Sequence, residues 1–576
     1  MTMYHFVYDL KFFGVTLDKR DEFSEEAEVV RDMDLITDCC RWIWETFMAS
    51  YSTARAAKPK HVATKPHIVL TLYPGNKKLP RSVPNQYHIC ICNVLRVEIK
   101  TSVSIEHTGC VKETSRIKAV LTLITSIPSR TPSTEPDKVT IIILSQKEGY
   151  NAAHADYLRE NIYEQADALE KELPHIVLSH KLNIKGSWTI VPLLTYLSGE
   201  FPDVEWFFFC LENTVIRLEK LLDVLGKFSS SQDVWMGYAL YDREPTIIHH
   251  FAQHTKKFKY PHIASGFAMS VTLLKSLSKQ ISKGKEPKAD FSIDVSYEFA
   301  IFVLNRTGVK LTHVSKLCIV SASDCATYPR FFHSCSSSVT PENIYFAVKT
   351  CAKFHLDRIP VIKKSWAKYD LNIGYFSDAA DKNLREAYIV PNTTEGHCAK
   401  TYAILQETSK ILKRRNFDWL AIVDDDTIFS VVRLLNLLTC YNPKHLVAIG
   451  ERYGFRIWDR YHGYQYLTGG AGVVLSAPLV QLIVEPGVCT CPSATTPDDM
   501  HLFGLCLLRL RVEGVHSPMF HQAQPIDYPY AYLASQEPIS FHRFWSVDPK
   551  AVYNDWFAEV DKVLPLADTP LKHTEL

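Results

Sequence analysis

Apolar and polar positions follow two different periods along most of this chain. Short apolar runs at 119–124, Val139–Leu144 and Ile344–Lys349 predict buried strands, and 157–173 predicts a helix. The clearest unit is 419–438, in which five apolar residues lead into three carboxylates and then into apolar residues at helical spacing. We expect a buried strand, an acidic turn at its carboxyl end and an amphipathic helix, which together are typical of an α/β sheet.

This pattern occurs twice. Residues 206–214 align without gaps on 419–427, and further along the chain 265–270 matches 471–476 in the same order. An acidic polar segment leading into an apolar helix then follows in both places. The sequence therefore predicts two copies of one α/β domain. We place a poorly defined N-terminal region at 1–105, a first copy at 106–335 and a second copy at 336–576.

The two copies differ in charge at corresponding positions. Asp424-Asp425-Asp426 in the second copy stands where the first copy has Leu211-Glu212-Asn213. Carboxylates needed only for capping a helix have no reason to be lost so selectively. We expect the first copy to keep the fold without the chemistry, as a scaffold or a platform for an acceptor. The alternative is that the first copy has an activity of its own, because a fold alone does not decide function.

The acidic triplet is the main candidate for chemistry. Ligand sites in open α/β sheets lie off the carboxyl ends of strands. Three adjacent carboxylates there repel one another, so a cation is expected to share the site, and hard oxygen ligands suit a divalent metal. The structural alternative is a helix start, in which Asp426 or Thr427 is an N-cap and the other acids interact with the helix dipole.

Further candidates occur on both sides of the triplet. A polar loop leads into a predicted helix at 401–412 and carries Lys400, which suits a phosphate at the helix start. Gly469, Gly470 and Gly472 allow close approach of the backbone to a ligand. A second acidic turn and a histidine among aromatic residues follow, at Asp498-Asp499 and His542. The structural alternatives are ordinary turns for the loop and the glycines, an N-cap for the acids and a core histidine.

Composition narrows the class of protein. The 576 residues carry a formal net charge of +1, so no nucleic acid or other polyanionic partner is implied. An 18-residue apolar run is not found, so no transmembrane helix is predicted. Fifteen cysteines, two N-glycosylation sequons and a C-terminal His573-Thr574-Glu575-Leu576 that resembles an ER-retention signal favour the lumen of the endoplasmic reticulum. Because 1–30 do not read as a signal peptide, we expect the true N-terminus to be missing or incorrect.

Several short motifs together resemble a known family. They are Val348-Lys349-Thr350, Gly396-His397-Cys398, Asp424-Asp425-Asp426, Gly469-Gly470-Ala471-Gly472, Pro497-Asp498-Asp499 and Phe541-His542. In this order they resemble the Fringe-like β-1,3-glycosyltransferases of family 31. Within the family the chain is most similar to the branch of β-1,3-glucosyltransferases that extend O-linked fucose on thrombospondin type 1 repeats.

The resemblance implies an inverting transferase with two tandem GT-A-like, Rossmann-like nucleotide-sugar domains, the first degenerate and the second catalytic. It also implies UDP-glucose as donor, Mn²⁺ as cofactor and O-fucosylated thrombospondin repeats as acceptors. Asp426 and His542 would bind the metal, and Asp424 and Asp425 would orient the ribose and the metal's waters. Asp499 would be the general base, with Asp498 as second choice. The remaining candidates for contacts to the donor are Arg358, Lys364, Lys400, Gly469 and Gly470.

Two alternatives to this function stay open. One is a Fringe-like transferase that uses N-acetylglucosamine or galactose, since the pocket that selects the sugar cannot be identified in the sequence. The other is a non-catalytic lumenal binding protein or chaperone.

Overall fold

The computed structural model describes residues 134–567 except 253–256, 383, 385–386, 460–461 and 494, together with three earlier strands. The chain divides into two compact units, Met1–Ile127 and Pro128–Leu576. In the first unit β1, β3 and β2 form an antiparallel sheet in that order. Their bounds are Val69–Pro74 for β1, Tyr87–Cys92 for β2 and Leu95–Lys100 for β3. The strand predicted at 119–124 lies outside the described residues.

The second unit contains two large sheets. The first has the strand order β13-β8-β11-β6-β4-β5, with β4 parallel to β5 and β6, and β11 antiparallel to both of its neighbours. Its strands are β4 (Val139–Leu144), β5 (His175–Leu178), β6 (Trp206–Leu211), β8 (Trp235–Gly237), β11 (Phe267–Ser270) and β13 (Thr312–His313). Its helices are α4 (Gly149–Ala168), α5 (Val191–Glu200), α6 (Leu218–Leu225), α7 (Val271–Ile281) and α8 (Val295–Thr307).

Helices cover both faces of this first sheet. Ile142 and Phe207 on one face pack in a cluster with residues of α5, α7 and α8. Ile141 and Phe208 on the opposite face pack in a cluster with residues of α4 and α6. Because side chains alternate between the faces of a strand, burial on both faces favours a continuous apolar run, which β6 has throughout and β4 has except at Thr140.

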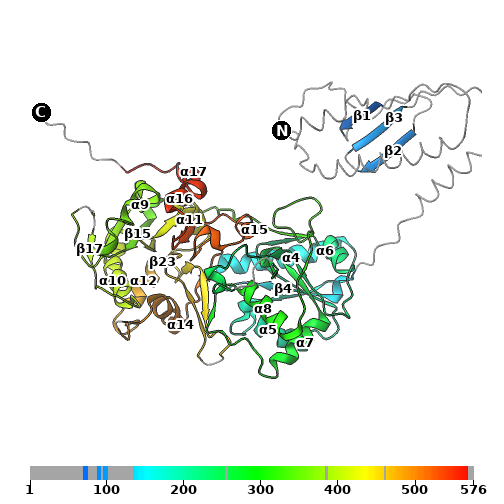
Figure 1. Ribbon diagram of the computed structural model, residues 1–576, viewed down its shortest axis with the longest axis horizontal. Coiled ribbons are helices and arrows are strands. Elements are labelled where there is room, and N and C mark those ends of the chain that lie inside the picture. Colours follow the sequence, from blue (N-terminus) through cyan, green and yellow to red (C-terminus); the bar gives the residue numbers. More distant parts are fainter. Residues whose placement is uncertain are drawn as a thin grey trace, which may run out of the picture. The chain divides into compact units, whose positions relative to one another are not determined.

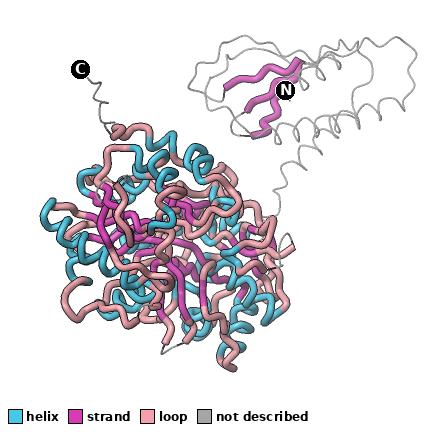
Figure 2. Tube along the Cα trace, turned by 60° about the vertical axis from the view of Figure 1, so that its left-hand side comes forward, coloured by secondary structure: helices cyan, strands magenta, loops and turns pink. Residues whose placement is uncertain are grey.

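The other large sheet has the order β17-β16-β15-β18-β23-β20-β24. Its strands are β15 (Ile344–Lys349), β16 (Ile373–Ser377), β17 (Ala387–Ile389), β18 (Trp419–Asp424), β20 (Ala448–Gly450), β23 (Val473–Ser476) and β24 (Val515–His516). One face packs against α9 (Ile359–Lys364), α11 (Val431–Leu438) and α16 (Pro549–Trp556), and the other against α10 (Cys398–Arg415) and α12 (Ala477–Ile483). Figure 2 shows helices and loops around these strands.

The repeat found in the sequence has a counterpart in strand order. Without the edge strand β17, β16-β15-β18-β23-β20-β24 matches β5-β4-β6-β11-β8-β13 in order and in the direction of every pair. The α/β character predicted from the sequence is therefore confirmed. The domain boundaries placed at 105 and 335 stay predictions.

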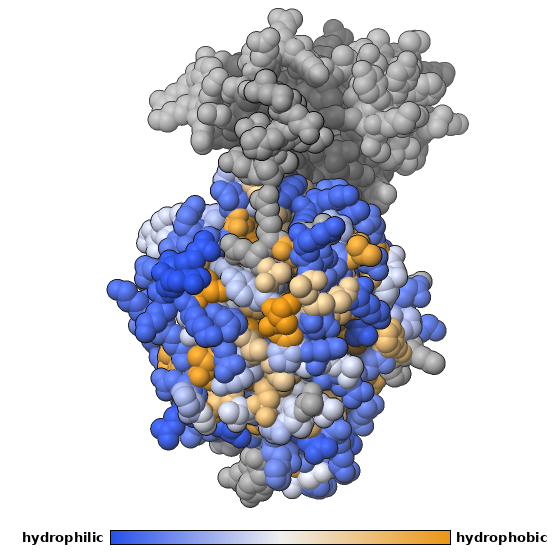
Figure 3. Space-filling view, turned by 90° about the vertical axis from the view of Figure 1, so that its left-hand side faces the viewer, coloured by the Kyte–Doolittle hydropathy of each residue, from blue (hydrophilic) through white to orange (hydrophobic). Residues whose placement is uncertain are grey.

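The halves of the second unit lie side by side, as Figure 1 shows. The short strand β12 (Phe291–Ser292) of the first half pairs with β21 (Arg452–Phe455) of the second, which forms a hairpin with β22 (Tyr464–Leu467). The amide of Gln146 donates a hydrogen bond to the carbonyl oxygen of His516 over 2.9 Å. On the surface, the face in Figure 3 is mostly hydrophilic, with scattered apolar side chains.

Several predicted boundaries are wrong. The segment predicted as a helix from 428 begins with a short strand, β19 (Thr427–Phe429), and the helix α11 starts only at Val431, after Ser430, whose hydroxyl accepts from the N–H of Arg433. Buried Ile428 and Phe429 satisfy the spacing of a strand as well as that of a helix, and pairing with a distant strand decides between them. The helix predicted at 157–173 begins eight residues earlier, as α4.

Four disulfides occur among the described residues. They join Cys318 to Cys325, Cys335 to Cys440, Cys398 to Cys491 and Cys489 to Cys506. None of the described helices has the length and apolar character that crossing a membrane requires.

Candidate active site

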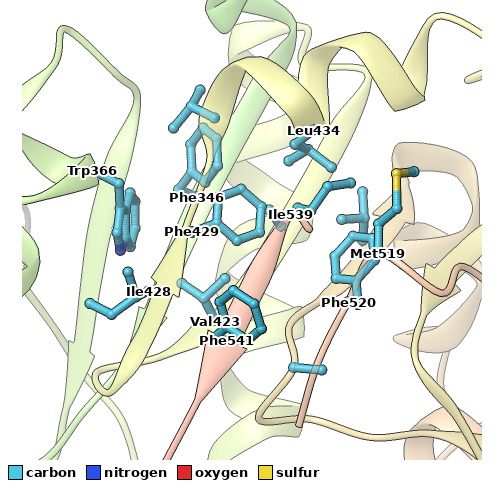
Figure 4. Close-up of a cluster of buried hydrophobic side chains, with 14 of the residues drawn as sticks. Phe346, Trp366, Val423, Ile428, Phe429, Leu434, Met519, Phe520, Ile539 and Phe541 are labelled. Atoms are coloured by element: carbon cyan, nitrogen blue, oxygen red, sulfur yellow. The ribbon is translucent and has the colours of Figure 1, made fainter. Parts of the chain in front are cut away.

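A large apolar cluster supports the acidic turn that follows β18. Val423 precedes the three aspartates, and in Figure 4 its side chain lies among those of Phe429 and Phe541. The indole of Trp366 donates a hydrogen bond to the carbonyl oxygen of Thr427 over 3.0 Å. Each fully buried phenylalanine contributes about 2–3 kcal/mol to folding, so the turn is attached to a rigid base. Figure 4 labels Phe346, Trp366, Val423, Ile428, Phe429, Leu434, Met519, Phe520, Ile539 and Phe541.

Strand pairing brings the predicted histidine to the predicted carboxylates. β19 pairs with β25 (Ser540–His542), and this register sets His542 opposite Thr427. Nε2 of His542 lies 3.1 Å from Oδ1 of Asp426 and 3.8 Å from Oδ2 of Asp424. One possible ligand atom from each of these three side chains lies within 4.8 Å of the others. Asp424, Asp426 and His542 thus lie together, as the sequence predicted, and we call these three residues the metal corner.

The donor set of this corner fits a divalent metal. Nδ1 of His542 lies 3.0 Å from the carbonyl oxygen of Gln522. A proton on Nδ1 is donated to that carbonyl and leaves Nε2, the nitrogen facing the carboxylates, as the ligand atom. Two carboxylates and an imidazole suit Mn²⁺, which accepts nitrogen more readily than Mg²⁺ does. The N–H of Gln522 in turn donates to the partly buried carboxylate of Glu451, so Gln522 connects His542 to this acid.

The charges of the corner stabilise one another. Burial alone would raise the pKa of Asp426, but the hydrogen bond from His542 and the positive charges of His542 and Arg358 lower it. Burial disfavours the charged imidazolium of His542, and Asp426 and Asp424 nevertheless raise the pKa of this histidine. The side chains of His542 and Arg358 therefore place positive charge beside the carboxylates, where a bound cation would also lie.

Asp425 is turned away from this corner and into the protein. Its carboxylate accepts hydrogen bonds from the hydroxyl of Thr350 over 2.7 Å and from Nη1 of Arg358 over 2.8 Å. The same nitrogen of Arg358 lies 2.9 Å from Oδ2 of Asp426. Asp425 therefore positions Arg358, which was predicted to contact the donor, beside the metal corner. The contact to ribose expected of Asp425 stays a prediction.

Lys349 is the residue that sequence reasoning missed. Its ammonium lies 3.0 Å from Oδ1 of Asp424 and 2.9 Å from Oδ2 of Asp498, and so joins the two acidic turns. Burial disfavours the charged ammonium, but these two carboxylates raise the pKa of Lys349. A signal was present in the sequence, because Lys349 is the charged residue that ends an apolar run. In the sheet this residue is paired with Asp424.

Asp498 and Asp499 have different surroundings. Asp498 is buried, and its Oδ2 also accepts a hydrogen bond from the hydroxyl of Thr401 over 2.6 Å. Asp499 is partly exposed, and burial together with the charge of Asp498 raises the pKa of Asp499 to about 6. A partly exposed carboxyl that titrates near neutral pH is suited to accept a proton, so the geometry favours Asp499 over Asp498 as the base.

The remaining predicted residues are divided between the site and the surface. The ammonium of Lys400 is buried and donates to the carbonyl oxygen of Thr350 over 2.9 Å, one residue from Lys349. Lys364 is exposed at the end of α9, and the structure does not bring it to the acidic groups. Gly469 lies next to Asp499 and Gly470 next to His542.

Gly470→Ala is expected to weaken metal binding at least tenfold while the protein still folds. A Cβ at this position would lie 2.4 Å from Cε1 of His542 and 2.7 Å from Nε2 of Gln522, so the imidazole must shift away from Asp426. The measurement is calorimetric titration of the variant with Mn²⁺. Gly469→Ala is the matched control, because its Cβ would meet Asp499 at 3.9 Å, which is ordinary contact. Equal metal affinity in both variants would contradict the placement of His542.

Lys349→Met is expected to lower the free energy of unfolding by about 3–5 kcal/mol at neutral pH, because removing one partner leaves buried carboxylates unpaired. Burial alone would raise the pKa of Asp498, but the positive charge of Lys349 lowers it. The stability that this depressed pKa supplies is present above the ordinary pKa of aspartate, ~3.9, and is lost as the pH falls through the lower folded value. The difference between wild type and variant in urea unfolding with EDTA should therefore narrow below about pH 4. A difference independent of pH would contradict the ion pair.

Comparison with known proteins identifies the family. The family described as Fringe-like matches residues 339–563. A β-1,3-glucosyltransferase of Mus musculus is 42% identical over 431 residues, which cover 73% of this chain and 86% of the relative. A β-1,3-glucosyltransferase of Homo sapiens is 41% identical over 434 residues, covering 74% and 86%. The β-1,3-N-acetylglucosaminyltransferase lunatic fringe of Gallus gallus is 25% identical over 209 residues, covering 32% of this chain and 57% of the relative.

The family match includes the groups described above. Lys349, the metal corner and Asp499 all lie within 339–563. The similarity to the two glucosyltransferases extends over most of the chain, so the resemblance predicted from short motifs is confirmed. This protein belongs to the Fringe-like β-1,3-glycosyltransferases.

Proposed function

We propose that the protein transfers glucose from UDP-glucose, with inversion, to the 3-hydroxyl of O-linked fucose on thrombospondin type 1 repeats. The observation that supports this most is the metal corner of Asp424, Asp426 and His542, connected through Lys349 to the acidic turn that carries Asp499. The names of the relatives support glucose as the transferred sugar. The acceptor follows from the resemblance of the sequence motifs.

Each charged group has a place in this reaction. Mn²⁺ held by Asp426, His542 and Asp424 would neutralise the negative charge that develops on the departing UDP. Arg358, which is held by Asp425, would add positive charge beside Asp426. Asp499 takes the proton from the acceptor hydroxyl. The hydroxyl oxygen of the acceptor bonds to the anomeric carbon of glucose while the bond from that carbon to the diphosphate breaks. Because the acceptor attacks directly, the protein supplies no nucleophile of its own, and the anomeric configuration inverts.

The first half would be a degenerate copy of the same GT-A-like domain. In the pairing of β4 with β6, Leu144 and Leu211 occupy the positions of Lys349 and Asp424. The strands β7 (Thr214–Ile216) and β14 (Thr327–Pro329) pair as β19 and β25 do. In that register Pro329 lies opposite Thr214, at the position where the second half has His542. Two apolar residues and a proline cannot supply the lysine, the carboxylate or the imidazole, so we assign this half a supporting role.

We further propose that the protein resides in the lumen of the endoplasmic reticulum. Four disulfides favour an oxidising compartment. The sequon residues Asn305 and Asn392 are both exposed, as glycosylation requires. The C-terminal resemblance to a retention signal lies outside the described residues. Sensitivity of the cellular protein to endoglycosidase H tests this placement, and an unglycosylated protein would contradict it.

The test of function uses a purified thrombospondin repeat that carries O-linked fucose. We expect transfer from UDP-glucose with Mn²⁺, and transfer at least a hundredfold slower from UDP-N-acetylglucosamine and UDP-galactose. The product is identified by mass spectrometry and its linkage by NMR. Preference for either other donor would assign the chain to a different Fringe-like activity. Binding of the repeat without transfer from any donor, and without hydrolysis of UDP-glucose, would favour a lumenal binding protein or chaperone.

A further inference from the structure

Gln522 is held by hydrogen bonds on both sides of its backbone. Its N–H donates to Glu451 over 2.5 Å, and its carbonyl oxygen lies 3.0 Å from Nδ1 of His542. Glu451 contributes to the wall of a cavity of about 380 Å³ between the two halves of the second unit, together with Leu144 and Leu211 of the first half. The backbone of Gln522 is therefore anchored both at this cavity and at the metal corner.

The side-chain amide of Gln522 has one possible orientation. Its Oε1 accepts a hydrogen bond from the N–H of Ala471 over 2.8 Å and another from the hydroxyl of Thr468. A backbone N–H can only donate, so the amide oxygen, and not the nitrogen, must face Ala471. A rotation that exchanged the two amide atoms would place two N–H donors against each other. The direction in which Nε2 points is therefore fixed.

Nε2 of Gln522 is a hydrogen-bond donor without a partner. No described residue accepts a hydrogen bond from this nitrogen, while both other polar groups of the residue are bonded on the backbone and at Oε1. The side chain of Gln522 is partly exposed, and Nε2 is not sealed from solvent. A donor that is fixed in direction and open to solvent is available to a ligand without any rearrangement of the protein.

This nitrogen lies beside the imidazole of His542. A Cβ on Gly470 would lie 2.7 Å from Nε2 of Gln522 and 2.4 Å from Cε1 of His542, so the amide and the imidazole flank the same glycine. The preceding residue, Gly469, lies next to Asp499. In the proposed reaction the base and the leaving diphosphate are on opposite faces of the anomeric carbon. The transferred sugar would thus lie between Asp499 and the metal corner, in reach of the amide.

We propose that Gln522 donates a hydrogen bond from Nε2 to a hydroxyl oxygen of the sugar in the nucleotide-sugar donor, and so contributes to the choice of sugar. This role rests on the proposed function, because it requires a nucleotide-sugar at the metal corner. An uncharged amide suits an uncharged hydroxyl, whereas the charge of a diphosphate would be met by Arg358 and the proposed metal. A fixed partner for a hydroxyl discriminates against sugars that lack this hydroxyl.

The experiment is calorimetric titration of the full chain with UDP-glucose and with UDP, both in the presence of Mn²⁺. Gln522→Met removes the amide and keeps the length of the side chain. The variant should lose about three- to tenfold more affinity for UDP-glucose than for UDP, because UDP lacks the hexose and one hydrogen bond is lost.

UDP-glucose analogues deoxygenated at C2, C3, C4 or C6 identify the hydroxyl. The wild type should bind one of these analogues about three- to tenfold more weakly than UDP-glucose. Gln522→Met should bind that analogue as well as it binds UDP-glucose, because the partner of the missing hydroxyl is already gone.

Gln524→Met is the matched control on the same segment. Gln524 is buried, and its amide donates to the hydroxyl of Ser546 over 2.8 Å. The control should melt at a lower temperature but keep the wild-type ratio of UDP-glucose affinity to UDP affinity. If Gln522→Met does not fold, Gln522→Glu takes its place, since a carboxylate still accepts from Ala471 but does not donate. The same fall in the ratio is expected of Gln522→Glu.

Two results would overturn the proposal. The first is an affinity for UDP-glucose that falls no more than the affinity for UDP, which would leave Gln522 a structural role alone. The second is a set of four deoxygenated donors whose losses all add to the loss caused by Gln522→Met. Failure of the proposed function looks different, because the wild type would then bind another UDP-sugar in place of UDP-glucose. The same comparison, made with that sugar, would still test Gln522.

Discussion

Asp426→Ala should reduce metal-dependent transfer by about a thousandfold or more, because it removes a carboxylate of the proposed metal site, beside which the leaving group would develop negative charge. Asp426 contacts both His542, at 3.1 Å, and Arg358, at 2.9 Å, so the alanine also leaves two cationic side chains without this partner. The measurements are the steady-state rate as a function of Mn²⁺ concentration and the calorimetric affinity for Mn²⁺. Both should fall together.

The control for Asp426→Ala is Asp555→Ala. Asp555 is exposed on α16, so the variant loses the same charge without touching the site. It should bind metal and turn over as the wild type does. Circular dichroism and thermal melting should show that both variants fold. Retained turnover with an unchanged requirement for Mn²⁺ in Asp426→Ala would refute the metal role of this residue.

Asp499→Asn should lower kcat by about a hundredfold to ten-thousandfold, the usual contribution of a general base, with little change in KM for UDP-glucose. Only the deprotonated carboxylate accepts a proton. Because burial and the charge of Asp498 raise the pKa of Asp499 to about 6, kcat of the wild type should fall as the pH drops through about 6. The residual rate of the variant should lack this acid limb. The measurement is kcat and KM between pH 5 and pH 8.

Asp498→Asn separates the base from its neighbour. Asp498 is bound by Lys349 and Thr401, so its replacement should lower stability and leave the acid limb of kcat in place, shifted to lower pH because the nearby negative charge is gone. An acid limb that survives in Asp499→Asn, or equal losses of donor affinity and kcat in that variant, would contradict the assignment of the base.

The central strands and the acidic turn could be predicted because both faces of each sheet are covered. Coverage makes the strands continuously apolar, so the point where carboxylates begin marks the carboxyl end of β18. His542 is different, because 115 residues separate it from Thr427, its partner in the sheet. Local pattern carries no information about such a pairing. The resemblance to a family supplied the role of His542. The register of β19 with β25 explains why His542 lies beside the carboxylates.

Other features depend on contacts that no local pattern contains. Lys349 could be seen as the end of a strand, but its two partners come from different turns, one of them Asp498, 149 residues away. The start of α11 was misplaced because Ile428 fits either period. The apolar helix predicted after the acidic segment Asp498-Asp499 contains a π-helical segment, His501–Cys506, which packs against β22. The cavity between the halves requires both sheets at once.

The hydrogen bonds of Gln522 create a mechanical link between two sites. Its carbonyl oxygen lies 3.0 Å from Nδ1 of His542, while its own N–H donates to Glu451, a residue in the wall of the cavity between the halves. Any occupant that moves Glu451 must also move the backbone that orients the imidazole. By thermodynamic reciprocity, a cation bound at His542 then changes the affinity of the cavity by the same factor. The hydrogen bonds of one glutamine would in this way couple the cavity between the halves to the site at His542.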